Sequence, residues 1–215
     1  MLSAVLKLAL LLILLSGGGL ALLRAQPNPD AARLALLTPP PGCAVPCWQG
    51  IQVGITEADT ALRLLENHAW VDRVIAEPDL IIWRWNGTQP ALIDGAHDGL
   101  LRVNRRGVVT QLRIQTRIAF GSLWPLLPPP SEVTLVRTMS RYSAHQILTY
   151  SELGLYLVHS HRCPAGPDDL WTGTVTIGMG TVWLSDSLNG RPFNIYGEPG
   201  WWRDLRACRR AAPPR

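Results

Sequence analysis

The chain has 215 residues, of which 47% are hydrophobic and 17% are charged, and its formal net charge is +4. This length fits one domain with a targeting segment or two small domains, and the hydrophobic content excludes an intrinsically disordered protein. The small net charge, without a basic stripe that carries aromatic residues, excludes nucleic acid as a partner.

Residues 1–25 have the pattern of an export segment. Lys7 is followed by an uncharged apolar run that continues to Leu23. Gly19 and Ala21 are small residues at the two positions that signal peptidase reads, which fits a signal peptide cleaved after Ala21. The segment is also long enough to span a bilayer as an uncleaved anchor. Both alternatives predict an extracytoplasmic domain, which is secreted in the first case and membrane-anchored in the second.

Residues 26–42, QPNPDAARLALLTPPPG, predict a proline-rich, semi-rigid spacer with one helical turn at most. The folded domain is expected over 43–210, and 211–215 are expected to form a disordered tail.

Four cysteines behind an export segment predict two disulfide bonds. Three pairings are open, and the simplest joins Cys43 to Cys47 in a local loop and Cys163 to Cys208 across a longer one. The first bond would fix the chain where the spacer becomes the domain, and Trp48 would then pack as the first core residue. The spacing Cys-x₃-Cys differs from the Cys-x₂-Cys of thioredoxin-type redox sites.

A metal site is the alternative use of one cysteine. His159, His161 and Cys163 alternate along the chain, so on a strand they would share one face and could bind zinc or copper. The spacing matches no standard zinc pattern, so the favoured interpretation is surface histidines, disulfide-bonded cysteines and no cofactor.

The clearest helix is predicted over 56–68. Thr56 and Asp59 have the spacing of a capping box. Apolar residues then recur at helical spacing, at Ala58, Ala61, Leu62, Leu65 and Ala69.

Strands are predicted next. The run DLIIWRWNG (79–87) predicts a strand that ends at Asn-Gly, and GLLRVNRRGVVTQLRIQT (99–116) predicts a hairpin with its turn at 104–107. In this hairpin, Leu101 and Val103 are expected to share one face with Val108, Leu112 and Ile114.

The pattern then restarts in a shorter form. An Ile-x-x-Gly motif and a Leu-Leu pair occur twice, first at Ile51, Gly54, Leu64 and Leu65 and again at Ile118, Gly121, Leu126 and Leu127. Two degenerate helix-then-strands repeats are therefore expected over 48–115 and 116–184, the second with a helix of about one turn. A hairpin (145–161) and a strand (GTVTIGMGTVWL, 173–184) complete the second copy. The glycines of that strand indicate close backbone approach rather than a phosphate loop, and the chain should end in a short helix around Trp201 and Cys208.

Together these patterns predict an α+β fold, with small antiparallel sheets and a few packed helices. The opening CW-x-G-I-x-x-G-x-T, from Cys47 to Thr56, resembles a group of uncharacterised bacterial envelope proteins. Its helix-then-strands unit is also similar to SmpA/OmlA-like and β-lactamase-inhibitor-like folds, in which a helical pair packs on a small antiparallel sheet, sometimes in tandem. The resemblance covers Cys43 to Arg137 and implies a non-enzymatic role in the envelope, by binding another protein or a wall polymer.

No H-E-x-x-H, G-x-S-x-G or Walker sequence is present, which disfavours an enzyme. The carboxylates of the C-terminal third leave a cell-wall hydrolase as an alternative (Asp168, Asp169, Asp186, Glu198 and Asp204). The nine tryptophans indicate core packing or an aromatic binding surface, for which the candidates are Trp83, Trp85, Trp201 and Trp202. The chain is thus expected to be an exported, disulfide-stabilised, non-catalytic binding module, with a metal-binding protein and a wall hydrolase as alternatives.

Overall fold

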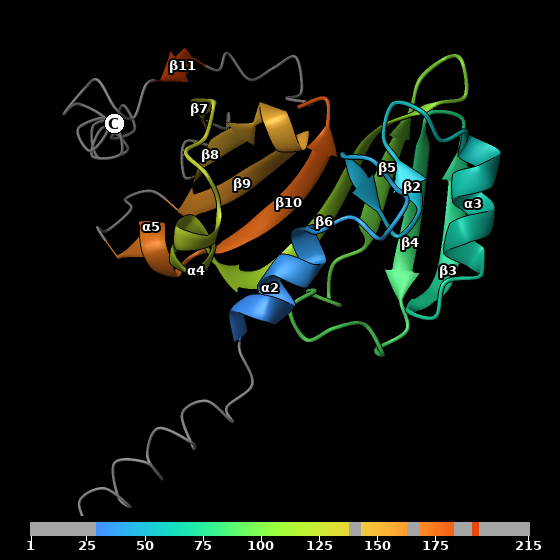
Figure 1. Ribbon diagram of the computed structural model, residues 1–215, viewed down its shortest axis with the longest axis horizontal. Helices are drawn as coiled ribbons and strands as arrows, with labels where there is room; N and C mark the ends of the chain where they lie inside the picture. The colour runs from blue at the N-terminus through green and yellow to red at the C-terminus, as the bar shows by residue number, and fades with distance from the viewer. Residues whose placement is uncertain (1–28, 138–142, 163–167, 183–190, 194–215) are drawn as a thin grey trace, which may run out of the picture.

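The computed structural model of the chain is shown in Figure 1, and it describes residues 29–137, 143–162, 168–182 and 191–193. Its centre is an antiparallel sheet of nine strands in the order β11-β7-β8-β9-β10-β6-β5-β4-β3, beside a two-stranded ribbon of β1 and β2. Short helices cover parts of this sheet, so the expected α+β class is confirmed.

The helices are α2 (Pro29–Leu37), α3 (Ala58–Glu66), α4 (Phe120–Leu123) and α5 (Asp169–Thr172), with 3₁₀ turns η1 (Trp124–Leu126) and η2 (Ser151–Leu153). The strands of the first half are β1 (Cys47–Trp48), β2 (Ile51–Gln52), β3 (Val71–Glu77), β4 (Leu80–Trp85), β5 (Gly99–Val103) and β6 (Val109–Ala119). Those of the second half are β7 (Glu132–Arg137), β8 (Ser143–Tyr150), β9 (Leu155–Arg162), β10 (Thr174–Gly180) and β11 (Arg191–Phe193).

The sheet consists of two meanders joined at their last strands. Strands β3 to β6 pair in chain order, as do β7 to β10, and β6 then pairs antiparallel with β10. Each meander follows a helical segment, α3 in the first half and α4 with η1 in the second, which is the element order expected of the two repeats. The expected boundary between 115 and 116 falls inside β6, because this strand continues to Ala119.

Helix α3 confirms the predicted helix but begins two residues later than expected, and the predicted capping box is wrong. The N-cap is Glu57, without a side-chain cap, and the Thr56 Oγ1 accepts a hydrogen bond from the Gln52 N–H at 2.8 Å. The backbone at this point is held by the β5–β6 turn, since the Ala58 N–H donates to the Gly107 carbonyl and the Val109 N–H to the Thr56 carbonyl. Contacts with a distant turn thus decide where the helix begins.

The hairpin of β5 and β6 is confirmed, with one correction to its register. Leu101 lies opposite Leu112, but Val103 lies opposite Val109, because the register shifts between Arg102 and Val103. Val109 is therefore fully buried on the core face, whereas the expected Val108 is only half-buried. A single irregularity in the pairing of the two strands therefore puts Val109, and not Val108, on the buried face.

Two glycines, Gly178 and Gly99, lie close to aromatic rings. The close approach at Gly178 was predicted from the glycine-rich strand over 173–184. A Cβ atom on Gly178 would lie 2.0 Å from the Tyr156 ring, whose hydroxyl accepts a hydrogen bond from the Gln111 side-chain amide. Burial of that hydroxyl raises the pKa of Tyr156 to about 12. A Cβ atom on Gly99 would lie 2.1 Å from the indole of Trp83, which is fully buried.

We predict that Gly99→Ala destabilises the fold, because the Trp83 indole is fully buried and is packed against Trp48 and Trp85. The free energy of unfolding from urea titration should fall by about 1–3 kcal/mol. Gly95→Ala is the matched control, since its Cβ atom would meet only the end of the flexible Gln89 side chain. Equal stability of both variants and the parent protein would contradict the packing of Trp83 on this glycine.

Candidate functional site: an apolar groove beside the cystine loop

A disulfide bond joins Cys43 to Cys47, as the simplest pairing predicted, with 6.0 Å between their Cα atoms. The bond closes a loop that leads directly into β1, and Trp48 is buried at the next position. The Val53 N–H donates to the Pro46 carbonyl at 3.0 Å, which ties this loop to the end of β2. We refer to residues 43–47 as the cystine loop. The second predicted pair, Cys163 and Cys208, lies outside the described residues.

Residues 29–37 do not behave as a spacer. They form α2, a helix of nine residues, and its Leu36 and Leu37 pack against the main hydrophobic core. The predicted spacer over 26–42 therefore contains a helix longer than the single turn expected, and this helix packs against the domain. The apolar residues at 34, 36 and 37 could have indicated that this helix packs against the domain. A helix that only separates two parts of a protein does not need an apolar face.

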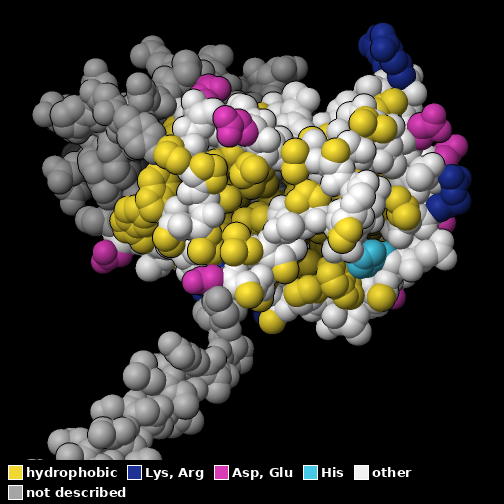
Figure 2. Space-filling model, in the orientation of Figure 1, with side chains coloured by type: hydrophobic (Ala, Val, Ile, Leu, Met, Phe, Trp, Pro, Cys, Tyr) yellow, Lys and Arg dark blue, Asp and Glu magenta, His cyan; other side chains and the backbone are white. Residues whose placement is uncertain are grey.

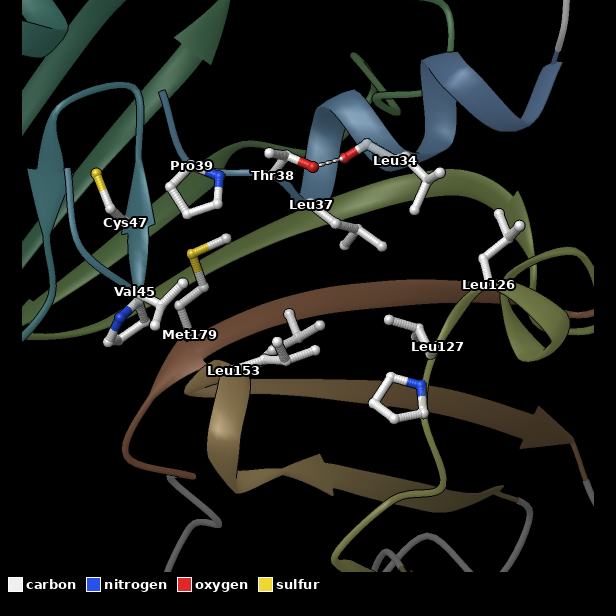
Figure 3. A pocket seen from close by; sticks show the side chains of 13 residues that line it. Leu34, Leu37, Thr38, Pro39, Val45, Cys47, Leu126, Leu127, Leu153 and Met179 are labelled. Atoms are coloured by element: carbon white, nitrogen blue, oxygen red, sulfur yellow. Dashed lines mark hydrogen bonds between the residues drawn. The ribbon is translucent and has the colours of Figure 1, made fainter. Parts of the chain in front are cut away.

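A groove of about 270 Å³ lies between α2 and the second meander. Figure 3 shows Leu34 and Leu37 on α2, Val45 on the cystine loop, and Leu126 and Leu127 at the opposite wall. Met179, at the end of β10, points into the groove from the sheet. The other lining residues are Thr38, Pro39, Pro46, Cys47, Pro128, Leu153 and Leu155.

The lining is mainly apolar and has no charged side chain. The one hydroxyl group among the lining side chains, Thr38 Oγ1, donates a hydrogen bond to the Leu34 carbonyl at 2.7 Å. The one cysteine in the lining, Cys47, forms the disulfide bond with Cys43. A ligand with polar groups at this place would leave them without partners, at a cost of roughly 1–3 kcal/mol for each buried group. The lining therefore favours a hydrocarbon ligand over a polar one.

Part of this apolar surface is open to solvent. Leu34 and Val45 retain 41% and 47% of their accessible surface, whereas Leu155 and Met179 at the floor are buried. Figure 2 shows hydrophobic side chains gathered on this face, over the half of the molecule that contains α4 and η1. A contiguous exposed apolar region of this kind usually marks a binding surface.

The tryptophans of β4 are not part of a binding surface. Trp83 is fully buried and Trp85 is 6% exposed, so their prediction as surface anchors is wrong and their packing in the core is observed. Trp48 stacks on Trp83 with 5.5 Å between ring centroids, as expected of a first core residue, and on His68 at 5.8 Å. Burial lowers the pKa of His68. Trp201 and Trp202 lie outside the described residues.

His159 does not lie on the surface, contrary to expectation. It is fully buried on the core side of β9, where its ring stacks on Phe120 at 5.8 Å, and Gly173 leaves room for its Nε2 atom. The backbone of His161 pairs with Ala144, but its side chain and Cys163 lie outside the described part of the structure. Within the described residues, no three metal-ligating side chains come together.

Two of the candidate carboxylates of a hydrolase are described. Asp168 and Asp169 are exposed at the start of α5, and the Asp168 carbonyl accepts hydrogen bonds from the Trp171 and Thr172 N–H groups. Their position is that of residues that begin a helical turn. Asp186, Glu198 and Asp204 lie outside the described residues.

Comparison with protein-family models, curated proteins and solved structures found no match. In the described ranges, no helix has the length and apolar character needed to cross a membrane.

We predict that the double variant Cys43→Ser/Cys47→Ser stays folded but loses about 2 kcal/mol of unfolding free energy, because the disulfide restricts only a short loop of the unfolded chain. Urea titration under non-reducing conditions measures this loss. The control is the variant Cys163→Ser/Cys208→Ser, in which only the Cys43–Cys47 bond is left, and reductant should lower its unfolding free energy by the same amount. A loss well above this value would mean that the cystine loop holds much more of the domain than its local contacts indicate.

Proposed function

We propose that this chain is an exported, non-catalytic binding protein of the bacterial envelope, and that its groove holds an acyl chain of a membrane lipid or a lipid-linked envelope molecule. The observation that carries the proposal is the groove between α2, the cystine loop and the second meander, with its uncharged lining. Ligand sites normally place a few polar groups to orient a ligand. A groove without them suits a hydrocarbon chain whose polar head stays in solvent.

The position of the groove in the chain supports a lipid rather than a wall glycan. The apolar N-terminal segment ends at Leu23, and α2 begins at Pro29. The intervening residues 24–28 span at most about 18 Å when fully extended. In the membrane-anchored form, α2 and the groove beside it would therefore lie close to the bilayer surface. A glycan would need hydrogen-bonding groups that the lining does not provide.

The alternatives have less support. A zinc or copper protein would require His159 at an accessible site, and this side chain is buried against Phe120. A wall hydrolase would require two carboxylates that face a cleft, and neither Asp168 nor Asp169 lines the groove. A protein partner remains the expectation nearest to the acyl-chain proposal, because an apolar side chain could enter the same groove.

We predict that Leu37→Gln weakens the binding of a fluorescent long-chain fatty acid at least tenfold, because it places an unpaired amide in the hydrocarbon site. Titration of the purified protein with this probe measures the dissociation constant. Leu64→Gln is the matched control: Leu64 also lies on a helix, is 37% exposed and lines no part of the groove.

A second variant distinguishes loss of the binding site from loss of folding. Leu126→Phe narrows the groove without adding a polar group, and it should also weaken probe binding while the far-ultraviolet circular dichroism stays unchanged. Absence of probe binding by the parent protein, or equal binding by all variants, would overturn the acyl-chain proposal. Binding of an apolar peptide but not of the fatty acid would replace the lipid by a protein partner.

Export is tested separately by the intact mass of the natively expressed protein, with and without reductant and alkylation. We expect four blocked thiols, because an oxidising compartment would pair all four cysteines. Loss of the N-terminal residues would identify a cleaved signal peptide, and their retention in a membrane fraction would identify an anchor. Free thiols in a full-length cytosolic protein would contradict export.

A further inference from the structure

Strand β3 is the last described strand at one end of the nine-stranded sheet. β3 pairs with β4, and no described strand pairs with its other side. An edge strand presents a row of backbone N–H and C=O groups that can bind another strand. In β3, five of the seven residues are exposed, including Ile75 with 43% of its accessible surface.

The side chains of β3 divide between two faces. Val74 packs against the main core beside Trp83, which lies opposite it on β4. Arg73, Ile75 and Glu77 alternate with it and therefore lie on the opposite, outer face. Their partners across β4 are Arg84, Ile82 and Leu80, respectively.

Arg73 lies in an unfavourable environment within one copy of the protein. It is directly opposite Arg84, and like charges in this position destabilise a sheet. Arg84 has a carboxylate, Asp98, at 3.7 Å. Among the described residues, neither Arg73 nor Glu77 forms an ion pair.

We propose that β3 binds β3 of a second copy of this chain as an antiparallel strand, with Ile75 on the two-fold axis. In this register Ile75 lies opposite its own counterpart, Arg73 lies opposite Glu77 of the second copy, and the reverse pair forms by symmetry. The core-side residues Val74 and Ala76 also lie opposite each other. Each unpaired charge thus gains an opposite charge, and the exposed isoleucine is covered.

The charges of β3 select this register over its neighbours. Centred on Val74, the pairing would place Arg73 opposite Ile75, and centred on Ala76 it would place Ile75 opposite Glu77. Centred on Arg73 or on Glu77, it would bring identical charges together. Charged residues and an irregularity at Asp72 are devices that protect an edge against unspecific pairing. In β3, these charges leave the register centred on Ile75 as the favourable symmetric pairing. In this pairing the same surface of both copies forms the contact, as in a closed two-fold dimer.

The test is the solution mass of the natively expressed protein over a wide range of concentration, by sedimentation equilibrium, in detergent if the N-terminal segment is retained. We expect a monomer–dimer equilibrium. Arg73→Glu and Glu77→Arg should each raise the dimer dissociation constant about tenfold, because each creates two facing like-charge pairs. The double variant Arg73→Glu/Glu77→Arg should restore the parent value. Arg105→Glu, the same change at the exposed β5–β6 turn, is the control and should have no effect.

A cysteine trap tests the register directly. Opposite residues of an antiparallel pair have Cα atoms about 4.5–5.5 Å apart, which a disulfide can join. Oxidised Ile75→Cys should therefore form a covalent dimer, and Ile55→Cys, at an isoleucine that is 66% exposed elsewhere, should not. A single-chain mass at every concentration, a dimer insensitive to both charge reversals, a double variant that does not recover, or equal trapping at both cysteines would each overturn the proposal. None of these outcomes bears on fatty-acid binding by the groove.

Discussion

The antiparallel pairing of β6 with β10 is the contact on which the rest of the structure depends. It joins two meanders that would otherwise be separate small sheets, each with one half of a core. Ile114 lies opposite Ile177 at the centre of the joint, and both are buried. Side-chain hydrogen bonds fix the joint near its two ends: the Thr116 hydroxyl donates to the Val175 carbonyl at 2.6 Å, and the Gln111 amide donates to the Thr181 carbonyl at 3.0 Å. Because a slip by one residue would place the core faces of the two meanders on opposite sides of the sheet, these bonds and the buried isoleucines reinforce the same register.

The groove follows from this joint. Met179, at its floor, pairs with Leu112 across the joint and with Leu155 on β9. One wall is α2 and the cystine loop, which precede the first meander, and the other is formed by Leu126 and Leu127, which lead into the second. The lining residues thus extend from 34 to 179 in the sequence. The disulfide contributes by fixing the chain from Val45 to Cys47, where it forms the edge of the groove.

Features set by neighbouring residues were predictable, and features set by distant ones were not. The β5–β6 turn is encoded locally: the Asn104 carboxamide oxygen accepts hydrogen bonds from the Arg106 and Val108 N–H groups. The start of α3 is decided by that turn, about fifty residues away, and the capping-box pattern at Thr56 could not reveal it. β3 was not predicted, because its apolar residues do not alternate with polar ones as in a strand with one buried face (Val71, Val74, Ile75 and Ala76). The period of two correctly placed Trp83 and Trp85 on one face, but only the fold decides that this face is the inner one.

The two proposed contacts lie on different parts of the sheet and are compatible in one assembly. The groove lies beside β10, and β3 is the last strand beyond β6, β5 and β4 (Figure 1). A two-fold axis through Ile75 and normal to the sheet keeps the core faces of both copies on the same side. Leu37 of α2 packs on that core side, so both α2 helices would lie on one face of the dimer. In the proposed membrane-anchored form, a pairing that inverted one copy would place its α2 on the face away from the bilayer. The symmetry that satisfies Arg73 and Glu77 is therefore also the symmetry that lets both grooves face the same surface.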